Sequence, residues 1–565
     1  MSNLRVLMGL PAVVLGAVAF LHAAEPAVGQ NDPIAELQAA AATQNSSEMG
    51  HWGHDPKNYK QWGSHSNRLI PIYTFGTKGS GSGVDLDSYT GANSLYRKAE
   101  RIQELYGYDA PETVNPAAEY CDQTDIYRIQ RAAIDAGKKH VFLIVFDGMD
   151  WETTRAAAIY KSGKVGYDSG RGQGLHMQDY SASGTTQFGY MVTSPHNEGT
   201  DVDANLQIVK NPNGTIRGGY SAERGGPNPW TPGSDKEYPI SQPKDAPMRH
   251  AYIDSSSSAT SMTTGIKTFN NCVNVDYAGA PVATIAHEAQ RAGYSVGAVT
   301  SVPISHATPA AAYAHNVHRD DYQDLTRDLL GLKSISHPES PLPGLDVLIG
   351  GGYGHVVKGK PAAKLKAADV QGDNFVPGNL YLTDADRAAV DVANSGKYVV
   401  ATRVPGRKGG ADLREAAARA ATEKHPLLGF YGLGSAKGHL PFQTADGRYD
   451  PVQGRAKEVE SYTPEEISEN PTLVDMTESA ITVLSKNPKG FWLMIEAGDV
   501  DWANHNNNID DSIGATLSGD AAVKAVTDWV ETSSNWQDSL VIVTADHGHY
   551  LVIEKPELLI PAAAK

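Results

Sequence analysis

From Lys139 onward, apolar runs of strand length alternate with segments of helical periodicity. This alternation constrains the fold more than any other feature of the 565-residue chain. The runs are continuous and apolar, as expected for strands buried on both faces. The expected strands are 140–146, 294–300, 346–349, 398–401, 427–431, 491–495 and 540–544. The expected helices are 94–106, 125–136, 282–292, 384–393, 413–423, 473–485 and 520–531. The pattern predicts an α/β fold: a three-layer sandwich with a large, mostly parallel central sheet flanked by helices, with loop insertions.

Other parts of the chain lack this regular pattern. Residues 51–90 are rich in Gly, Ser, Asn and aromatics with little periodicity, and we interpret residues 25–137 as an N-terminal extension of a main domain at 138–565. Within the main domain, residues 176–250 are rich in Gly, Pro, Asn and Ser, which predicts an insertion of loops over the sheet edge. Residues 433–470 form a second irregular segment.

The first 24 residues have the composition of a secretory signal peptide. Residues 1–5 are short and basic, residues 6–21 are largely apolar, and His22-Ala23-Ala24 precedes Glu25. An N-terminal membrane anchor is the alternative, although the apolar run is short for a bilayer span. No later segment has the length and apolarity of a transmembrane helix. We therefore expect an exported protein, periplasmic or extracellular.

Charge and cysteine content narrow the function further. The formal net charge of -17 argues against a nucleic-acid partner, because phosphate backbones favour basic surfaces. A small phosphorylated substrate stays compatible with this charge, since bound metal ions invert the local field. Only Cys121 and Cys272 occur, so one disulfide is permitted but not established, and a thiolate metal site is not expected.

Two polar segments lie where ligands bind in open α/β sheets, beyond the carboxyl ends of strands. Asp147 ends the apolar run 140–146 and is followed by a glycine, so it is a candidate metal ligand or a helix cap. Ser255 opens a serine run before 261–267, which could start a helix. A serine at a helix N-terminus lies beside unpaired N–H groups that favour an alkoxide and a bound phosphate. A Ser-rich cap or linker is the alternative interpretation.

Two further segments carry ligand-type residues after strands. Asp501 and His505 are four residues apart, so a helix would place both on one face, a spacing that suits zinc. Glu496, at the end of the run 491–495, is an oxygen donor better suited to magnesium. Asp546 and His547 follow the run 540–544 directly. Acids gathered at one sheet edge would repel one another unless cations neutralised them, so a metal site explains these segments better than a solvated surface.

Together the segments resemble the alkaline phosphatase family over roughly residues 138–550, outside the insertion. The motifs are Asp-Ser-x-x-x-Ala-Thr-x-x-x-x-Gly, Ala-Thr-Pro-Ala-Ala, Glu-x-x-x-x-Asp-x-x-x-His and Thr-Ala-Asp-His, in that order. The resemblance implies hydrolysis of phosphate monoesters at alkaline pH through a phosphoserine intermediate, assisted by two zinc ions and one magnesium ion. It also implies small phosphorylated substrates and a homodimer.

Carried over residue by residue, Ser255 resembles the nucleophile and Arg319 the arginine that clamps the phosphate. The ligand sets resemble those of one zinc (Asp147, Ser255, Asp546 and His547), the other zinc (Asp501 and His505) and magnesium (Asp147, Thr308 and Glu496). The implied mechanism is in-line displacement: Ser255 is activated beside one zinc, and the leaving-group oxygen is stabilised beside the other.

The chain departs from the family pattern at three places. His306 stands where some members have an acid beside magnesium, and Trp502 stands where some have lysine or histidine. The family also supplies a last zinc histidine downstream of the Asp-His motif, in a Gly-x-His-Thr-type segment, whereas only eighteen residues follow His547 here. The resemblance therefore leaves the leaving-group zinc with two protein ligands, a loss expected to weaken zinc binding. His549 and His439 are candidate replacements.

Two other functions remain open at this point. A phosphodiesterase of the same superfamily is one, although Arg319, Thr308 and Glu496 favour monoesters, and neither cysteine lies in a sulfatase pattern. The other is a secreted metal- or phosphate-binding homologue that has lost turnover because a zinc ligand is missing.

Overall fold

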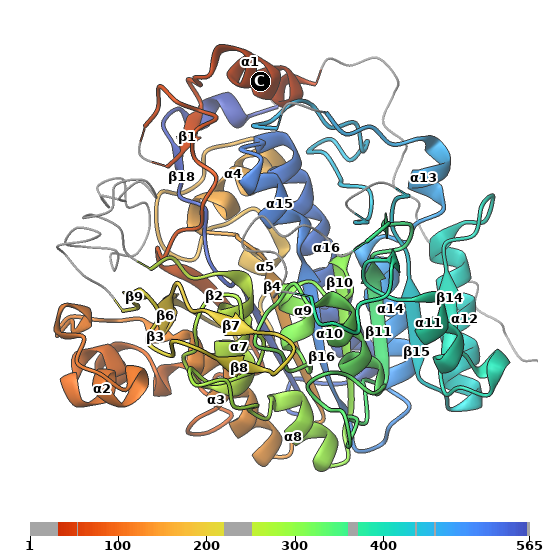
Figure 1. The fold of residues 1–565 in the computed structure, drawn as a ribbon. Coiled ribbons are helices and arrows are strands. Elements are labelled where there is room, and N and C mark those ends of the chain that lie inside the picture. Colours follow the sequence, from red (N-terminus) through yellow and green to blue (C-terminus); the bar gives the residue numbers. More distant parts are fainter. Residues whose placement is uncertain are drawn as a thin grey trace, which may run out of the picture. The chain divides into compact units, whose positions relative to one another are not determined.

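The apolar run His140–Phe146 forms strand β4 in the middle of a ten-stranded sheet in the computed structural model (Figure 1). The strand order is β14-β15-β11-β10-β16-β4-β17-β2-β5-β3. All neighbours from β14 to β17 are parallel, whereas β2 pairs antiparallel with both β17 and β5. The predicted large, mostly parallel sheet is therefore confirmed.

The structure describes residues 32–53, 55–219, 251–359, 371–434, 438–456 and 459–561. The predicted signal peptide at 1–24 lies outside these residues, as does the part of the predicted insertion from 220 to 250. Within the described residues, no helix has both the length and the apolarity needed to cross a membrane.

All seven expected strands are present with small shifts at their ends. The strands of the central sheet are β2 (Ile70–Phe75), β3 (Cys121–Asp122), β4, β5 (Gln187–Val192), β10 (Ser295–Pro303), β11 (Val347–Gly351), β14 (Val399–Thr402), β15 (Leu427–Phe430), β16 (Phe491–Ala497) and β17 (Ser539–Thr544). Short paired strands lie outside it: β1 (Gly50–Trp52) with β18 (Leu551–Ile553), β6 (Asn197–Glu198) with β9 (Ile216–Arg217), β7 (Val202–Asp203) with β8 (Ile208–Val209), and β12 (Val356–Val357) with β13 (Gly378–Asn379).

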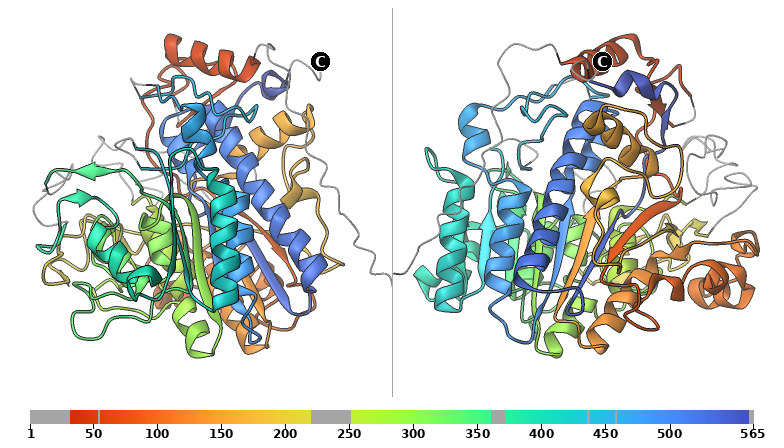
Figure 2. Two further views of the ribbon diagram at one scale, coloured as in Figure 1. Left: turned by 90° about the vertical axis from the view of Figure 1, so that its right-hand side faces the viewer. Right: turned by 180° about the vertical axis from the view of Figure 1, so that it is seen from behind.

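Helices cover both faces of the sheet, which Figure 2 shows edge-on in its left view. One layer contains α4 (Trp151–Ser162), α5 (His176–Asp179), α12 (Gly409–Glu423), α14 (Leu473–Leu484) and α16 (Ile509–Ser533). The other contains α3 (Gln123–Asp135), α7 (Ser255–Thr264), α8 (Ile285–Arg291), α9 (Ala307–Ala311) and α10 (Tyr322–Leu330). Further helices are α1 (Pro33–Gln44), α2 (Ala99–Tyr106), α11 (Asp384–Val390), α13 (Pro464–Ser468) and α15 (Asp499–His505). The three-layer arrangement follows from apolar strands that must be covered on both faces.

The sequence did not reveal the antiparallel end of the sheet. β2 comes from the predicted N-terminal extension, and β5 comes from the segment expected to be loops. Pro71 within β2 weakens the strand signal, because proline cannot donate to a ladder and is typical of sheet margins. Both segments are nevertheless covered and largely buried, so the extension contributes β2 and β3 to the central sheet and the insertion contributes β5.

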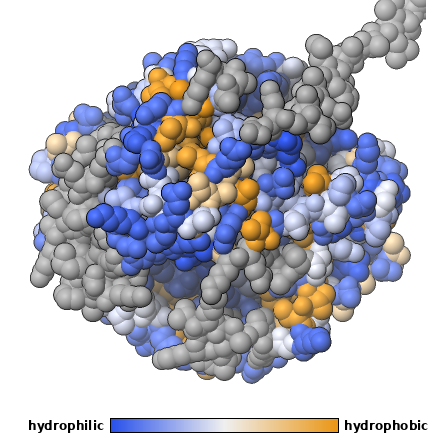
Figure 3. All heavy atoms as spheres, turned by 90° about the horizontal axis from the view of Figure 1, so that it is seen from above, coloured by the Kyte–Doolittle hydropathy of each residue, from blue (hydrophilic) through white to orange (hydrophobic). Residues whose placement is uncertain are grey.

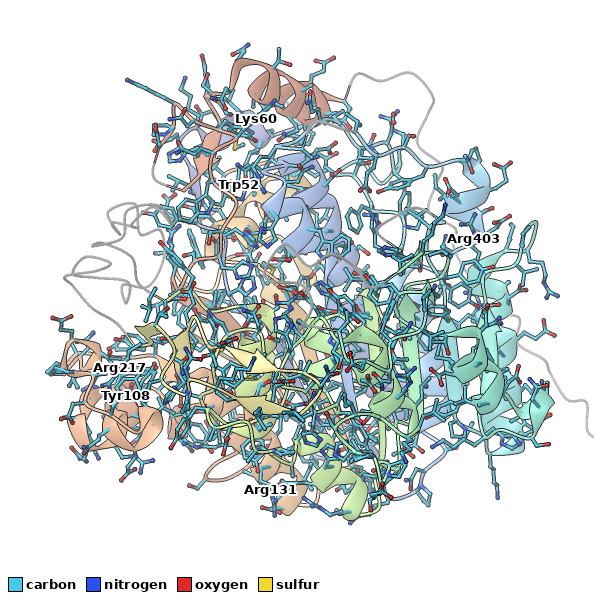
Figure 4. The ribbon with its side chains drawn as sticks, in the orientation of Figure 1. Trp52, Lys60, Tyr108, Arg131, Arg217 and Arg403 are labelled. Atoms are coloured by element: carbon cyan, nitrogen blue, oxygen red, sulfur yellow. The ribbon has the colours of Figure 1, made fainter. Side chains whose placement is uncertain are left out.

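The N-terminal segment packs on the C-terminal part of the chain, as α1, β1 and β18 show in Figure 1. The side-chain amide of Gln38 donates to the backbone carbonyl of Asn507 over 3.1 Å. Trp52 in β1 (Figure 4) is fully buried, and its ring centroid lies 5.7 Å from that of Tyr59. These contacts bring residues far apart in sequence to the edge of the sheet where the polar segments gather.

The surface and the two cysteines also bear on the expectations from the sequence. Seen from above, apolar side chains form small groups among hydrophilic ones (Figure 3). Cys121 and Cys272 are both buried and free, so the disulfide that the sequence permitted is not formed.

Candidate active site

The serine expected to act as nucleophile lies at the first position of a helix. Asp254 has extended backbone and caps α7, since its carboxylate accepts a hydrogen bond from the backbone N–H of Ser257 over 3.0 Å. The helix therefore begins at Ser255, earlier than the predicted start at 261. Asp254 is a strong N-cap residue, and the serines that follow it tolerate the helical backbone. Ser255 is left beside the unpaired N–H groups of the first turn.

Ser255 lies against the end of β4 and the end of β17. Its Oγ is 3.4 Å from Asp147 Oδ1 and 3.1 Å from His547 Nε2. Gly148 follows Asp147 with a φ of +74°, and a Cβ there would lie 2.7 Å from the ring of His549. Glycine at this turn thus allows the strand end and the histidines to approach closely.

Several hydrogen-bond acceptors lie close together around Ser255, with fewer protons than contacts between them. His547 Nδ1 faces the backbone carbonyl of Gly548 at 3.3 Å, so Nδ1 carries the proton and Nε2 is bare. That Nε2 lies 3.4 Å from Asp147 Oδ1 and 3.4 Å from Asp546 Oδ2. The hydroxyl of Ser255 has one proton for two acceptors, Asp147 Oδ1 and His547 Nε2, and Asp546 Oδ2 lies next to the latter. A cation among them would satisfy all three, and aspartate oxygens with an imidazole nitrogen are zinc ligands.

A second cluster forms on α15, where Asp501 and His505 share one face as predicted. His65, from the connection between β1 and β2, completes it. The Nδ1 of His65 donates to the carbonyl of Ile253 at 2.8 Å, and the Nδ1 of His505 donates to the carbonyl of Gly63 at 3.1 Å.

The two Nε2 atoms of His65 and His505 are therefore both unprotonated, yet they face each other at 3.0 Å. They lie 3.7 Å and 3.5 Å from Asp501 Oδ1. Burial lowers the pKa of His65 well below its usual value and that of His505 to about 4, so a shared proton does not relieve the contact at neutral pH. A metal ion bound by two imidazoles and one carboxylate would relieve it.

His549, one of the two candidate replacements, belongs to the same group: one potential ligand atom of each of His65, Asp501, His505 and His549 lies within 4.8 Å of the others. The Nε2 of His549 lies 2.6 Å from Asp501 Oδ1, the distance of a charge-assisted hydrogen bond that orients the carboxylate. His439, the other candidate replacement, stacks on Phe442 with 4.0 Å between ring centroids, and its Nε2 lies 3.1 Å from Glu460. His439 is thus not in the candidate metal clusters found among the described residues.

A third group of oxygen ligands forms at the second carboxylate oxygen of Asp147, Oδ2, where Thr308 and Glu496 approach. The hydroxyl of Thr308, on α9, lies 3.4 Å from Asp147 Oδ2. Glu496 Oε2 accepts from the hydroxyl of Thr300, while Oε1 is buried without a hydrogen-bond partner among the described residues. This oxygen-rich group is the donor set that magnesium prefers.

Four buried carboxyl groups lie close together in the site, and bound cations would stabilise their ionised forms. Asp147, Glu496, Asp501 and Asp546 are at most 3% exposed, and within the described residues the ion pairs of Asp147, Asp501 and Asp546 are with histidines. Burial raises the pKa of Glu496 to about 8 and that of Asp546 to about 7. Burial and the neighbouring Asp546 raise the pKa of Asp147 well above its usual value. The residues present therefore fit bound divalent cations, which would hold these carboxylates ionised.

Arg319 reaches the site through Asp254. Its Nη1 donates to Asp254 Oδ2 over 2.9 Å, while Asp254 also caps α7. Burial alone would raise the pKa of Asp254, but the guanidinium lowers it to about 2. Arg319 and Ser255 both line a cavity of about 570 Å³ that also contains His65 and Asp501. The guanidinium is thus placed where a phosphate bound at Ser255 would meet it.

His306 and Trp502 form part of the cavity wall. Their ring centroids are 5.6 Å apart, and Trp502 also contacts the rings of His439 and Phe442. Burial lowers the pKa of His306 to about 3, so this imidazole is neutral at neutral pH. Both residues lie beside the clusters rather than within them.

The residue that sequence reasoning missed is His65, and the signal was present. Gly63-Ser64-His65-Ser66 matches the Gly-x-His-Thr-type segment expected downstream of Asp546. It lies upstream of every other motif, and the antiparallel bridge between Ser66 and Gly548, beside the pairing of β2 with β17, returns it to the site. His65 is thus a further candidate ligand of the cluster on α15, in addition to Asp501 and His505.

Comparisons with known proteins identify related sequences and structures. A family model described as alkaline phosphatase matches residues 222–558. The chain is 31% identical to the alkaline phosphatase of Escherichia coli and 30% identical to that of Escherichia fergusonii, in each case over 54% of this chain and 60% of the relative. It is 29% identical to alkaline phosphatase 4 of Bacillus subtilis, over 52% of this chain and 49% of the relative.

The match covers only part of these relatives: 60% of the length of the two Escherichia proteins and 49% of the Bacillus protein. A cold-active alkaline phosphatase from Shewanella sp. aligns with a TM-score of 0.41 and 20% identity, over 73% of this chain and 68% of that one. His65 and Asp147 lie outside the residues that the family model matches, so their assignment depends on the distances above.

Proposed function

The chain belongs to the alkaline phosphatase family, and on that premise we propose that it hydrolyses phosphate monoesters with Ser255 as its nucleophile. One observation carries the proposal. The hydroxyl of Ser255 begins a capped helix and lies within 3.4 Å of both Asp147 and His547, in a buried group of lone pairs that lacks protons. A bound phosphate and cations would satisfy both the helix N-terminus and the lone pairs.

We propose two zinc ions and one magnesium ion as the cofactors. One zinc would be held by Asp147, Asp546 and His547 beside Ser255, the other by His65, Asp501 and His505, and magnesium by Asp147, Thr308 and Glu496. When bound, such ions make a serine hydroxyl easier to deprotonate and stabilise charge on the leaving oxygen.

The chain's own residues then account for the course of the reaction. Arg319 binds two non-bridging oxygens of the phosphate and is held in place by Asp254. Ser255 loses its proton to solvent, its Oγ forms a bond to phosphorus, and the bond from phosphorus to the leaving-group oxygen breaks. Water then attacks the phosphoserine from the vacated side, which releases phosphate and restores Ser255. N–H groups at the start of α7 stabilise the charge that develops on the oxygens.

The test compares hydrolysis of p-nitrophenyl phosphate by the wild type and by Ser255→Ala at alkaline pH with zinc and magnesium present. We expect the substitution to lower kcat by at least about 10³-fold. Ser261→Ala, on the same helix and outside the cavity, is the matched control and should retain activity. Equal hydrolysis by wild type and Ser255→Ala would remove Ser255 from the mechanism.

The same assay separates the alternatives. A phosphodiesterase would favour bis(p-nitrophenyl) phosphate over the monoester, whereas the guanidinium of Arg319 favours the more highly charged monoester. A metal-binding homologue without turnover would hydrolyse neither. That second alternative depended on an absent zinc ligand, a position for which His65 is now the candidate. Export and a homodimer remain predictions from the sequence and the resemblance.

A further inference from the structure

A second group of metal-ligating side chains lies outside the residues assigned to the candidate active site. It contains His315, which follows α9, Asp328 in α10, and His337 in the connection between α10 and β11. One potential ligand atom from each lies within 4.8 Å of the others. Three separate segments of the chain thus converge on one small volume.

His315 carries an unused lone pair. Its Nε2 faces the backbone carbonyl of Val282 at 2.9 Å, so the proton is on Nε2 and Nδ1 is unprotonated. Nδ1 is buried and has no hydrogen-bond partner among the described residues, and His315 is only 5% exposed. The ring of His287 stacks parallel to it at 5.2 Å and holds its orientation. A histidine that donates one N–H to a carbonyl and offers the other nitrogen is arranged as metal-bound histidines are.

Asp328 and His337 supply the other two ligands. Asp328 is fully buried, and its two oxygens lie 3.0 Å and 3.1 Å from His337 Nδ1. The backbone N–H of His315 donates to the same carboxylate over 3.0 Å, which fixes the carboxylate next to that residue. The side chain of His337 is 16% exposed, so this is the side from which an ion can enter.

We propose that His315, Asp328 and His337 form a further binding site for a divalent transition metal, with zinc as the ion that suits it best. Two imidazoles and one carboxylate, with water as a fourth ligand, are a zinc donor set. Tetrahedral zinc at about 2.0–2.1 Å from its ligands sets them about 3.4 Å apart. The described separations of up to 4.8 Å can close by rotation of His337, which lies on the partly exposed connection.

The proposed ion would link the connection after α10, which carries His337, to the segment that leads to Arg319. Asn316, next to His315, pairs with Val273 in an isolated bridge, and the backbone N–H of Arg319 donates to Asn271 over 2.7 Å. An ion at this position would hold the connection after α10 against the segment that leads to Arg319. Its role is structural, and it is independent of the proposed chemistry at Ser255.

The experiment uses crystals of the intact protein grown with Zn²⁺, with anomalous data collected at the zinc absorption edge. We expect a peak bounded by His315, Asp328 and His337, separate from peaks at the candidate active site. His337→Ala should remove that peak alone and lower the zinc content in solution by one equivalent. His425→Ala, a histidine outside the candidate metal clusters found among the described residues, should change neither.

The outcomes separate this proposal from the proposed function. A wild-type crystal without a peak at His315 overturns the further site and identifies the contact as a hydrogen bond between His337 and Asp328 only. Equal zinc contents of wild type and His337→Ala do the same in solution. A peak here with none beside Ser255 would leave this site standing and remove the metal-dependent function.

Discussion

At the scale of single residues, the unprotonated Nε2 atoms of His65 and His505 are the strongest indication of a metal site. Carbonyl oxygens can only accept hydrogen bonds, so the carbonyls of Ile253 and Gly63 fix the protons of His65 and His505 on Nδ1. Two bare Nε2 atoms 3.0 Å apart repel each other unless something positive lies beside them. His65 is therefore expected to be a ligand as important as Asp501.

We predict that His65→Ala removes one of the bound zinc ions. Loss of a direct ligand should weaken zinc at that cluster by more than about 100-fold, beyond the loss typical of outer hydrogen-bond partners. His439→Ala is the matched control, because this histidine contacts Glu460 and Trp502 instead. Metal analysis of the purified variants gives the result. Retention of zinc in His65→Ala together with its loss in His439→Ala would reverse the assignment.

Predictability from sequence differed from residue to residue. Asp147, Glu496, Asp501 and Asp546 were predictable because each follows or ends a continuous apolar run, and parallel strands bring their carboxyl ends to one edge. His65 was missed although Gly63-Ser64-His65-Ser66 carries a recognisable pattern, because no apolar run marks its position and the other members of its cluster come more than 400 positions later. Only long-range pairing in three dimensions places it.

At the scale of elements, close packing hid the start of one helix from the sequence. α16 was predicted at 520–531, yet it begins at Ile509, where Asn508 caps it. Gly514 and Gly519 weaken the helical signal. A Cβ at Gly519 would lie 2.3 Å from the ring of Phe146, so glycine there allows the helix to lie against β4. The interruption in the pattern therefore marks a packing contact and not a helix end.

The cap of α7 gives the prediction at this scale. Asp254→Ala removes both the cap and the partner of Arg319, so we expect the free energy of unfolding to fall by about 1–2 kcal/mol. Asp254→Asn keeps a capping oxygen and should cost less stability. Urea denaturation of the two variants and the wild type measures the difference. If asparagine costs as much as alanine, the ion pair with Arg319 and not the cap holds this end of the helix.

At the scale of the whole molecule, the proposed cations would link distant parts of the chain, and their removal should change how stability depends on pH. In the absence of metal, the folded-state pKa values of Glu496 and Asp546 are about 8 and about 7, above the unfolded values of 4.5 and 3.8. The folded state holds more protons than the unfolded state across that interval, so stability falls as pH rises through it. His505 has a folded pKa of about 4 against 6.5. Its contribution to stability therefore grows as pH rises to about 6.5 and stays constant above that pH.

We therefore predict that the metal-free protein loses stability between about pH 6.5 and pH 8, while the metal-loaded protein does not. Tm of chelated and zinc-loaded samples, recorded at both pH values, provides the measurement. The difference in Tm between the two samples should be larger at pH 8. A chelated protein that is equally stable or more stable at pH 8 would show that these carboxylates do not repel one another as described.

The most direct measurement of the central claim is to trap the enzyme during turnover. The protein is mixed with p-nitrophenyl phosphate in zinc and magnesium, quenched in acid, digested, and analysed by mass spectrometry. We expect phosphate on Ser255, dependent on metal and absent after chelation. Metal-dependent hydrolysis with no phosphate on Ser255, or with phosphate on another side chain, would contradict the account.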